Sequence, residues 1–451
     1  MQSIRQFRVF ENYIKKSFEI AQQPNDADGQ WYLERTVSEA INNCSFPDFG
    51  PVHINVPLQE PLYETSIENE VVLPKLITVA STKPILVDEF ESNLRSSWER
   101  SSRKLILVGL QDYNESLNKQ LAQIAKDPSV IVMAESTSNL RGDFFLYNID
   151  RIADQLSDEE KAIFRPEIIL TIGGVLVSKK IKTLLRKYTN IEHWRVDPAA
   201  KHADTFQHLT SLIPISSDSM IGIVQNWDIH SESSYSAQVR AIDAKRTVIQ
   251  HQYTAGAPFS DFKVMDYLLK HIPNESFLQL GNSTPVRYSN IFGIDPNKNI
   301  LVNGNRGVGG IDGTLSTAAG AASTTSKIVT IITGDLAFFY DSNGLWNDNL
   351  PANLRVILIN NSGGNIFRII PGPDSCDELE QFFESKHTLN AKGISETFGL
   401  DYYFCSEMAT VENCIPDFYN PSKQAAAVLE IKTNNELSAK VLKTYFSFIQ
   451  Q

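Results

Sequence analysis

Cysteine is scarce in this chain of 451 residues, which contains only four. They form no CxxC pair and show no spacing typical of metal ligands; they are Cys44, Cys376, Cys405 and Cys414. The eight histidines are also scattered, with no HxxxH pair. Because disulfide frameworks belong mainly to secreted proteins, we expect four reduced side chains that pack within a cytosolic protein.

Long apolar runs and an excess of basic residues are also lacking. No apolar run approaches the ~18 residues that a membrane span requires, and the first residues do not form a basic and apolar signal segment. Acidic residues outnumber basic residues by 53 to 41, which gives a formal net charge of −12. This charge disfavours nucleic acids and anionic membranes as partners. We therefore expect a cytoplasmic protein with neither partner, in which local basic residues must meet any anionic substrate.

The pattern that is present is one of β-rich runs separated by helical stretches, which predicts an α/β fold of two or three compact units. Strand-like runs occur at residues 51–57, 104–110, 129–135, 167–174, 193–196, 276–281, 299–305, 328–334, 355–360 and 425–434. Helical spacing occurs at residues 31–42, 114–126, 179–188 and 258–273, the last with Ser260 or Asp261 as its N-cap. This alternation predicts doubly wound, mostly parallel sheets. Residues 197–252 show no clear pattern.

Two strand-like runs in the middle of the chain end in glycine. The first ends at Gly109 and the second at Gly173-Gly174. A dinucleotide-binding strand would be followed by GxGxxG, and neither run is. The pattern therefore favours a structural spacer domain over a nucleotide-binding one.

Two apolar runs within residues 303–367 are followed at once by polar groups. The run IVTIITG leads into Asp335, and the run RVILI leads into Asn360-Asn361 and then a pair of glycines, Gly363 and Gly364. Buried parallel strands of this kind deliver a carboxylate, an amide and a flexible backbone carbonyl to the carboxyl edge of a sheet. These are hard oxygen ligands suited to a Mg²⁺ ion that holds a diphosphate. The alternative role of Asp335 is that of a helix cap, and the two roles are compatible.

Three linked motifs in this region resemble those of a known family. They are NRGxxGIDG from Asn305, GDL at residues 334–336, and NNxGGxIF from Asn360, which begins 26 residues after GDL. GD followed by NN resembles the diphosphate-binding motif of thiamine-diphosphate enzymes. Leu336 stands where most of those enzymes have glycine, and with this change the set is similar to that of the 2-succinyl-5-enolpyruvyl-6-hydroxy-3-cyclohexene-1-carboxylate (SEPHCHC) synthases of menaquinone biosynthesis.

The resemblance implies a thiamine-diphosphate-enzyme fold that binds thiamine diphosphate and Mg²⁺, or Mn²⁺. Its implied metal ligands are Asp335, the Asn361 side-chain oxygen and the Gly363 carbonyl. Ile311 is expected to wedge under the cofactor and keep its two rings bent, although a core isoleucine is the alternative. The other implied cofactor contacts are Gly309, Gly334, Leu336, Gly364, Ile366 and Phe367.

The resemblance also implies decarboxylation of 2-oxoglutarate and addition of the resulting succinyl carbanion to isochorismate. Arg287, Arg306 and Ser283 match family positions that hold carboxylates, which arginine can grip with two parallel hydrogen bonds. Lys179 and Lys180 match a Lys-Arg pair that receives the isochorismate carboxylate; the alternative is a solvated helix face. Gln2 matches an active-site glutamine. Asp312 is either an arginine partner or a turn residue, and the sequence does not separate the two.

By the same resemblance, the chain is expected to divide into four parts. Residues 1–63 would be the end of a pyrimidine-binding domain, 64–83 a linker, 84–255 a central α/β domain and 256–451 the diphosphate-binding domain. About a hundred family residues would precede Met1, including the glutamate that activates the cofactor. The chain is thus expected to derive from a late gene start, a fragment or a natural truncation whose missing half comes from another chain, and to be inactive alone.

The family's active site lies between two chains, which implies a homodimer or a homotetramer. Two alternatives to SEPHCHC synthase remain open. The first is another thiamine-diphosphate-dependent decarboxylase or carboligase, and the second is a non-catalytic cofactor-binding subunit.

Overall fold

The structure is a computed structural model that describes residues 4–20, 26–58, 63, 73–80 and 84–450. Gln2, an expected active-site residue, lies outside the described residues. The chain forms two compact units. One contains residues 1–86, 197–201 and 213–215, and the other contains residues 87–196, 202–212 and 216–451.

The first unit is built on a small parallel sheet. Strand β1 (Lys16–Glu19) pairs with β2 (Val52–Asn55), and helix α1 (Ala27–Ser45) packs against both strands. Asp26 begins this helix by accepting a hydrogen bond from the Gly29 amide at 2.7 Å. The helix and β2 agree with the expected elements, whereas β1 lies in a segment for which no strand was expected.

The second unit contains a five-stranded sheet in the order β4-β3-β5-β6-β7. Its strands are β3 (Lys104–Val108), β4 (Val130–Ala134), β5 (Ile168–Ile172), β6 (Glu192–Val196) and β7 (Leu209–Ile213). The pairs β3–β4, β3–β5 and β5–β6 are parallel. The helices of this part are α2 (Asp88–Arg100), α3 (Glu115–Ile124), α4 (Ile149–Ala153), α5 (Asp158–Phe164), α6 (Lys179–Leu185) and α7 (Ser217–Asn226).

The second unit also contains a six-stranded, wholly parallel sheet in the order β12-β13-β11-β10-β8-β9. Its strands are β8 (Phe277–Leu280), β9 (Leu301–Gly304), β10 (Val329–Gly334), β11 (Leu354–Asn360), β12 (Asp401–Cys405) and β13 (Ala427–Lys432). The strand order reverses between β8 and β10. Ligands bind at such a switch point, beyond the carboxyl ends of the strands.

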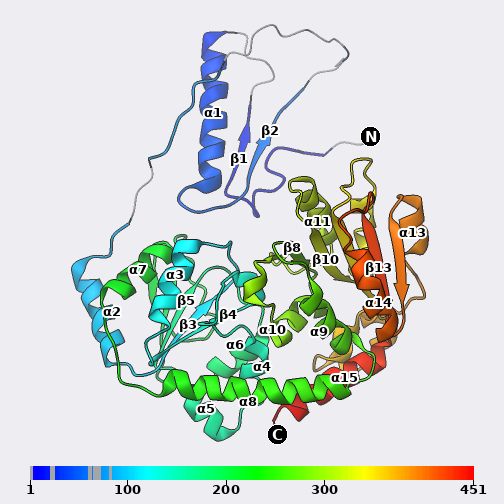
Figure 1. Cartoon of the computed structure of the whole chain (residues 1–451). Coiled ribbons are helices and arrows are strands. Elements are labelled where there is room, and N and C mark those ends of the chain that lie inside the picture. The colour runs from blue at the N-terminus through cyan, green and yellow to red at the C-terminus, as the bar shows by residue number, and fades with distance from the viewer. Residues whose placement is uncertain (1–3, 21–25, 59–62, 64–72, 81–83, 451) are drawn as a thin grey trace. The chain divides into compact units, whose positions relative to one another are not determined.

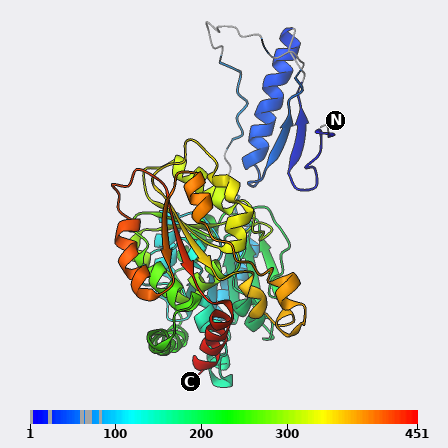
Figure 2. The same cartoon turned by 90° about the vertical axis from the view of Figure 1, so that its right-hand side faces the viewer.

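Helices cover both faces of the six-stranded sheet (Figure 2). One face packs against α9 (Asp261–His271), α10 (Thr284–Phe292), α14 (Met408–Phe418) and α15 (Asn435–Phe448). The other face packs against α11 (Thr314–Ser323), α12 (Asp335–Tyr340) and α13 (Lys392–Thr397). Successive residues of β11 alternate between these faces, because Ile357 and Ile359 lie in the first core and Val356 and Leu358 in the second.

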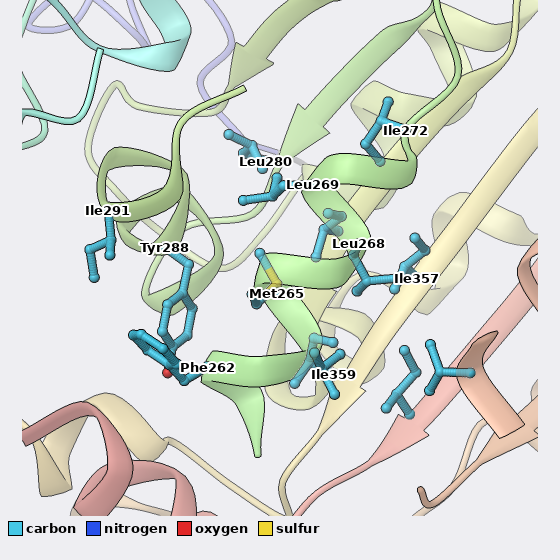
Figure 3. Packing of buried hydrophobic residues seen from close by; sticks show 14 of the residues in the cluster. Phe262, Met265, Leu268, Leu269, Ile272, Leu280, Tyr288, Ile291, Ile357 and Ile359 are labelled. Carbon is cyan, nitrogen blue, oxygen red and sulfur yellow. The ribbon is translucent and has the colours of Figure 1, made fainter. Parts of the chain in front are cut away.

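Helix α9 fills the centre of the first core (Figure 3). Its Leu268 lies beside Ile357 of β11, and Met265, Leu268, Ile357 and Ile359 of this core are each at most 4% exposed. Burial of a side chain of this size stabilises the fold by roughly 1.5–3 kcal/mol. The packing fixes the start of α9 relative to the end of β11.

Two features join the halves of the second unit. Helix α8 (Tyr235–Gly256) runs along both of them, packing against α4 and α5 in one and α9 and α15 in the other (Figure 1). Asn139, just after β4, reaches the outer strand of the six-stranded sheet. Its Oδ1 accepts from the Val302 amide at 2.7 Å and its Nδ2 donates to the Val302 carbonyl at 3.0 Å.

The expected fold class is confirmed, with doubly wound α/β architecture and mostly parallel sheets. Strand β7 and helix α8 lie in the stretch that showed no clear pattern, and β12 was also not expected. Across the described ranges, none of the helices combines the length and the apolar character that a membrane crossing needs.

Candidate functional site

The expected site residues leave the six-stranded sheet at its carboxyl edge. Strands β10 and β11 are parallel neighbours, and Gly334 pairs with Ile359. Asp335 and Asn360 are therefore the next residues on two adjacent strand ends. This confirms that the two strands lie side by side, as the sequence pattern indicated.

Asp335 is the first residue of α12 and is 2% exposed. Its Oδ1 accepts from the Leu336 amide at 2.7 Å, and its Oδ2 accepts from the Gly363 amide at 2.9 Å. The side chain therefore bonds within the first turn of the helix and also ties the end of β10 to the glycine turn after β11. His387 Nε2 lies 3.3 Å from Oδ2.

The two consecutive asparagines have different partners. Asn360 bonds within the sheet and beside it, donating to the Leu389 carbonyl at 2.9 Å and to Glu430 at 2.6 Å and accepting from Lys432 at 3.0 Å. Asn361 donates through Nδ2 to Asp261 at 2.8 Å. Its Oδ1 is buried and has no hydrogen-bond partner among the described residues. Asn361 is therefore the asparagine with an oxygen left for a ligand.

Asp261 was expected as a possible helix cap, and the structure gives it another position. Ser260 is the N-cap residue of α9, but its Oγ donates to the Pro258 carbonyl at 2.9 Å. Asp261 follows as the first helical residue, is fully buried and accepts from Asn361 and from Asn365. Burial raises the pKa of Asp261, while its hydrogen bonds oppose the shift. The expected cap position is confirmed at Ser260, although neither side chain forms the capping hydrogen bond.

The glycine pair after β11 is required by close backbone contacts. Gly363 has φ +149°, and a Cβ atom there would lie 2.6 Å from the Glu384 carbonyl oxygen. Gly364 donates its amide to that same oxygen at 2.7 Å. The Gly363 carbonyl accepts from the Asn365 amide at 2.9 Å, which leaves one of its two lone pairs. No side chain can replace hydrogen at Gly363 without moving this turn.

The donor set fits a hard divalent cation that also binds a phosphate ligand. It comprises the Asp335 carboxylate, the free Asn361 Oδ1 and the Gly363 carbonyl, all of them oxygen atoms. Within the part of the chain that the structure describes, no group of three or more His, Cys, Asp or Glu residues could hold a metal. A cation at this edge would therefore need oxygen atoms from a bound ligand as well.

The loop after β9 carries the expected wedge residue. Asn282 holds this loop by donating to the Asn305 carbonyl at 2.7 Å and to the Gly310 carbonyl at 2.6 Å. Ile311 is 38% exposed, so it is not a core isoleucine. Gly309 has φ +74° and nothing within 4 Å of a Cβ position. The loop thus presents an apolar side chain and open backbone at the switch point of the sheet.

The two expected arginines lie close together. Arg306 donates to the Asn282 side chain, and its buried Nε lacks a hydrogen-bond partner in the described chain. Arg287 lies one turn into α10 and donates to the Ser283 carbonyl at 3.4 Å. Burial lowers the pKa of Arg287; the nearby Asp150 opposes this shift and the charge of Arg306 adds to it. Ser283 has φ +73°, an uncommon value for a residue with a side chain.

The lysines at the start of α6 are arranged differently from each other. Lys180 pairs with Asp154 at 2.9 Å and lies over the Phe446 ring, whereas Lys179 is exposed. Lys182, which was not expected, is near enough to Arg306 for that charge to lower its pKa, although burial is the larger cause. The helix start is held by Glu135, which accepts from the Val177 amide at 2.7 Å and the Ser178 amide at 2.6 Å.

A separate hollow lies at the opposite edge of the six-stranded sheet. It has a volume of about 520 Å³ and is lined by Trp346, Phe398, Leu400 and Ala426, among others. Leu400 and Ala426 immediately precede β12 and β13, so the hollow is at the amino ends of these strands. It is remote from the edge where parallel sheets bind ligands.

Comparison with known proteins identifies the family. No family model matches the chain. The chain is 38% identical to the 2-succinyl-5-enolpyruvyl-6-hydroxy-3-cyclohexene-1-carboxylate synthase of Christiangramia forsetii, over 100% of this chain and 80% of the relative. It is 36% identical to the synthase of the same name from Flavobacterium johnsoniae, over 99% and 78%, and 35% identical to that from Cytophaga hutchinsonii, over 100% and 80%. The chain belongs to the SEPHCHC synthase family. The family expected from the three motifs is thereby confirmed.

Three polar residues at this edge were not found from the SEPHCHC synthase motifs. They are Asp261, Asn365 and His387, which contact Asn361, Asp261 and Asp335 respectively. Asn365 lies inside the motif NNxGGxIF but at one of its variable positions. Asp261 lies a hundred residues before Asn361, so no local spacing could have indicated it.

Proposed function

We propose that this chain carries out the SEPHCHC synthase reaction, in which 2-oxoglutarate and isochorismate are joined with release of CO2. The observation that supports this most directly is the pair formed by Asp335 and Asn361 at adjacent strand ends, with a buried Asn361 oxygen that is free to bind. The family relationship supports the same reaction. No feature of the structure favours the two alternative functions.

The proposed cofactors are thiamine diphosphate and Mg²⁺ or Mn²⁺. When bound, thiamine diphosphate supplies the electron sink that allows a 2-oxo acid to lose CO2. Asp335, Asn361 and Gly363 would hold the metal ion that binds its diphosphate. Gly309, Ile311, Ile366 and Phe367 would contact its rings, and Gly334, Leu336 and Gly364 would form the surrounding backbone.

Arg287, Arg306 and Ser283 are proposed to bind substrate carboxylates. Each arginine has a charge that is partly removed from water, which strengthens a charge-assisted bond to an anion. The free Arg306 Nε is suited to such a bond, and Asn282 fixes the orientation of its guanidinium group. Lys179 and Lys180 are proposed for the second substrate, where Lys180 would have to exchange its bond to Asp154 for one to the ligand.

The assembly and cellular location follow the family expectation. We propose a homodimer or homotetramer in the cytoplasm, with residues 1–63 as part of a pyrimidine-binding domain and 64–83 as a linker. Residues 84–255 would form the central domain and 256–451 the diphosphate-binding domain. Gln2 remains a proposed site residue outside the described part of the chain.

The metal site can be tested by replacing Asp335. Asp335→Ala should weaken Mg²⁺-dependent binding of thiamine diphosphate at least 100-fold, because it removes the only carboxylate of the proposed ligand set. Isothermal titration calorimetry measures this affinity. Asp348→Ala is the matched control, since it removes the same charge from an exposed position beside the hollow at the opposite edge. An Asp335→Ala protein that binds the cofactor as tightly as the control would refute the site.

A further inference from the structure

The Asp261 carboxylate is surrounded by hydrogen-bond donors. Its Oδ2 accepts from Asn361 Nδ2 at 2.8 Å and from Asn365 Nδ2 at 3.3 Å. Its Oδ1 accepts from the hydroxyl groups of Thr433 and Ser438, the latter at 3.1 Å. Both oxygens are buried, and these four side chains come from three separate segments of the fold.

The two asparagines that donate to Asp261 share a second feature. Oδ1 of Asn361 and Oδ1 of Asn365 are both buried, and neither has a hydrogen-bond partner within the described ranges. Both oxygens of Asp261 accept hydrogen bonds in the structure, and each asparagine turns its NH2 group toward them. The carbonyl oxygen of each amide then has to point away from Asp261.

We propose that Asp261 is a positioning residue, which sets the amide orientation of Asn361 and Asn365 so that both present oxygen to the metal–diphosphate site. This inference rests on the proposed metal site. Asn361 would bind the ion through Oδ1. The Asn365 oxygen would accept a hydrogen bond from a water molecule on the ion, because its amide is oriented by the same carboxylate. An asparagine turned the other way would direct two N–H bonds at a cation, which repels them.

The core of the sheet holds Asp261 in place. Asp261 directly precedes Phe262, and Leu268 of the same helix lies beside Ile357 of β11, the strand that leads to Asn361 (Figure 3). The Asp261 amide also donates to Ser438 Oγ at 3.0 Å. The carboxylate and the proposed ligand are therefore fixed by one hydrophobic core. Residues outside the ligand set that orient a ligand typically change metal affinity by roughly 10–100-fold when they are replaced.

An isosteric substitution tests this role. Asp261→Asn keeps the volume but offers one acceptor oxygen in place of two, so it would hold the NH2 groups of Asn361 and Asn365 less firmly. We expect Mn²⁺ affinity in the presence of thiamine diphosphate to fall about 10–100-fold by titration calorimetry. Asp266→Asn, on the same helix and paired with Lys270, is the matched control and should bind as the unmodified protein does.

A reciprocal exchange separates positioning from a structural role. In the double variant Asp261→Asn with Asn361→Asp, Asn at 261 would donate to Asp at 361, whose second oxygen would face the ion. We expect Mn²⁺ affinity to return to within about tenfold of the unmodified protein. If Asp261 only stabilised the fold, the double variant would bind as weakly as Asp261→Asn alone.

The single variant Asn361→Asp completes the test. It places two carboxylates against each other, so Mn²⁺ affinity should fall even though a carboxylate is an intrinsically stronger ligand than an amide. If circular dichroism shows that the Asp261→Asn protein is not folded, the Asn361→Asp variant provides the test. Unchanged or tighter Mn²⁺ binding by Asn361→Asp would overturn the inference. Asp335→Ala distinguishes the two proposals. Weak Mn²⁺ binding by Asp335→Ala with normal binding by Asp261→Asn would refute only the role of Asp261. Normal binding by both variants would refute the metal site itself.

Discussion

Arg306 shows how a single side chain in this fold is prepared for an anion. Its guanidinium group is held by Asn282, which itself fixes two carbonyl groups of the loop after β9. The buried Nε atom has no bonding partner among residues 4–20, 26–58, 63, 73–80 and 84–450. An arginine that is oriented in this way loses little conformational freedom when it binds a carboxylate.

Replacing this arginine should impair turnover. Arg306→Ala is expected to lower kcat/KM for 2-oxoglutarate with isochorismate by at least ~100-fold, because it removes a charge-assisted contact to the substrate and the donor to Asn282 Oδ1. Arg306→Lys keeps the charge without the planar guanidinium group. Its kcat/KM should therefore lie between those of the unmodified protein and Arg306→Ala. Steady-state kinetics on the assembled enzyme provides the measurement. Kinetics unchanged by Arg306→Ala would exclude the residue from the substrate site.

At the residue scale, the sequence predicted groups that follow their own strand and missed groups that arrive from elsewhere. Asp335 and Asn361 could be predicted because each directly follows an apolar run, and parallel strands end at the same edge. Asp261 could not, because it is brought to Asn361 by packing of α9 on β11. The sequence around Asp261 resembles an ordinary helix start, and Asp261 was therefore predicted to be a helix cap.

Among the secondary-structure elements, the segment after β4 connects the two large sheets. Asn139 has φ +54° and bonds to both backbone groups of Val302, as a neighbouring strand would. Ser136 donates to the Ser289 carbonyl at 3.1 Å, and Glu135 accepts from Asn290 at 3.1 Å. The segment after β4 therefore contacts both β9, which leads into the loop of Arg306, and α10, which carries Arg287.

Removing the Asn139 side chain should destabilise this connection. Asn139→Ala leaves the amide and carbonyl of Val302 unpaired, at a cost of about 1–3 kcal/mol for each buried group. Urea unfolding should show this loss in the free energy of unfolding. Asn139→Gly removes the same bonds but tolerates the positive φ, so the difference between the two variants isolates backbone strain. A loss below about 0.5 kcal/mol for Asn139→Ala would contradict the connection, since one such bond alone contributes more.

The elements that the sequence did not predict have a physical explanation. The buried residues of α8 include Arg246, Gln250 and Thr254, so the helix shows little hydrophobic periodicity. Arg246 donates to the Arg151 carbonyl at 2.8 Å and to Glu160 at 3.0 Å, so its buried charge is paired with a carboxylate. Strand β12 is at the sheet edge and is only partly buried. Apolar periodicity reveals elements whose buried face is wholly apolar, whereas the buried face of α8 is partly polar and β12 is only partly buried.

For the molecule as a whole, buried titratable groups couple stability to pH. His193 in β6 lies within hydrogen-bond distance of Thr171, at 3.0 Å, and packs on Phe206. Burial lowers its pKa from 6.5 to about 4. Between pH 6.5 and 4 the unfolded chain therefore holds a proton on this residue that the folded chain does not, and the folded state loses stability as the pH falls. Burial raises the pKa of Glu135 to about 7 and that of Asp150 to about 6, which acts in the opposite direction.

A difference measurement isolates the histidine. Between pH 7.5 and 5.5, His193 should reduce the free energy of unfolding by about 1 kcal/mol, and His193→Gln should remove that part of the loss while leaving the contributions of the two acids in place. Tryptophan fluorescence can follow the transition, because Trp194 lies on the same strand with its ring centre 5.9 Å from that of Trp98. If the free energy of unfolding depends on pH in the same way in both proteins, His193 is not the group that causes the loss of stability.

The pairing of Asp261 with Asn361 has a consequence for the evolution of this family. An amide at position 361 requires an acceptor opposite it, and a carboxylate there would require a donor, so neither position can change its polarity alone without loss. Descendants of a common ancestor should therefore exchange the two residues together or keep both. Chains in which only one has diverged would be expected to have replaced the ion or abandoned it.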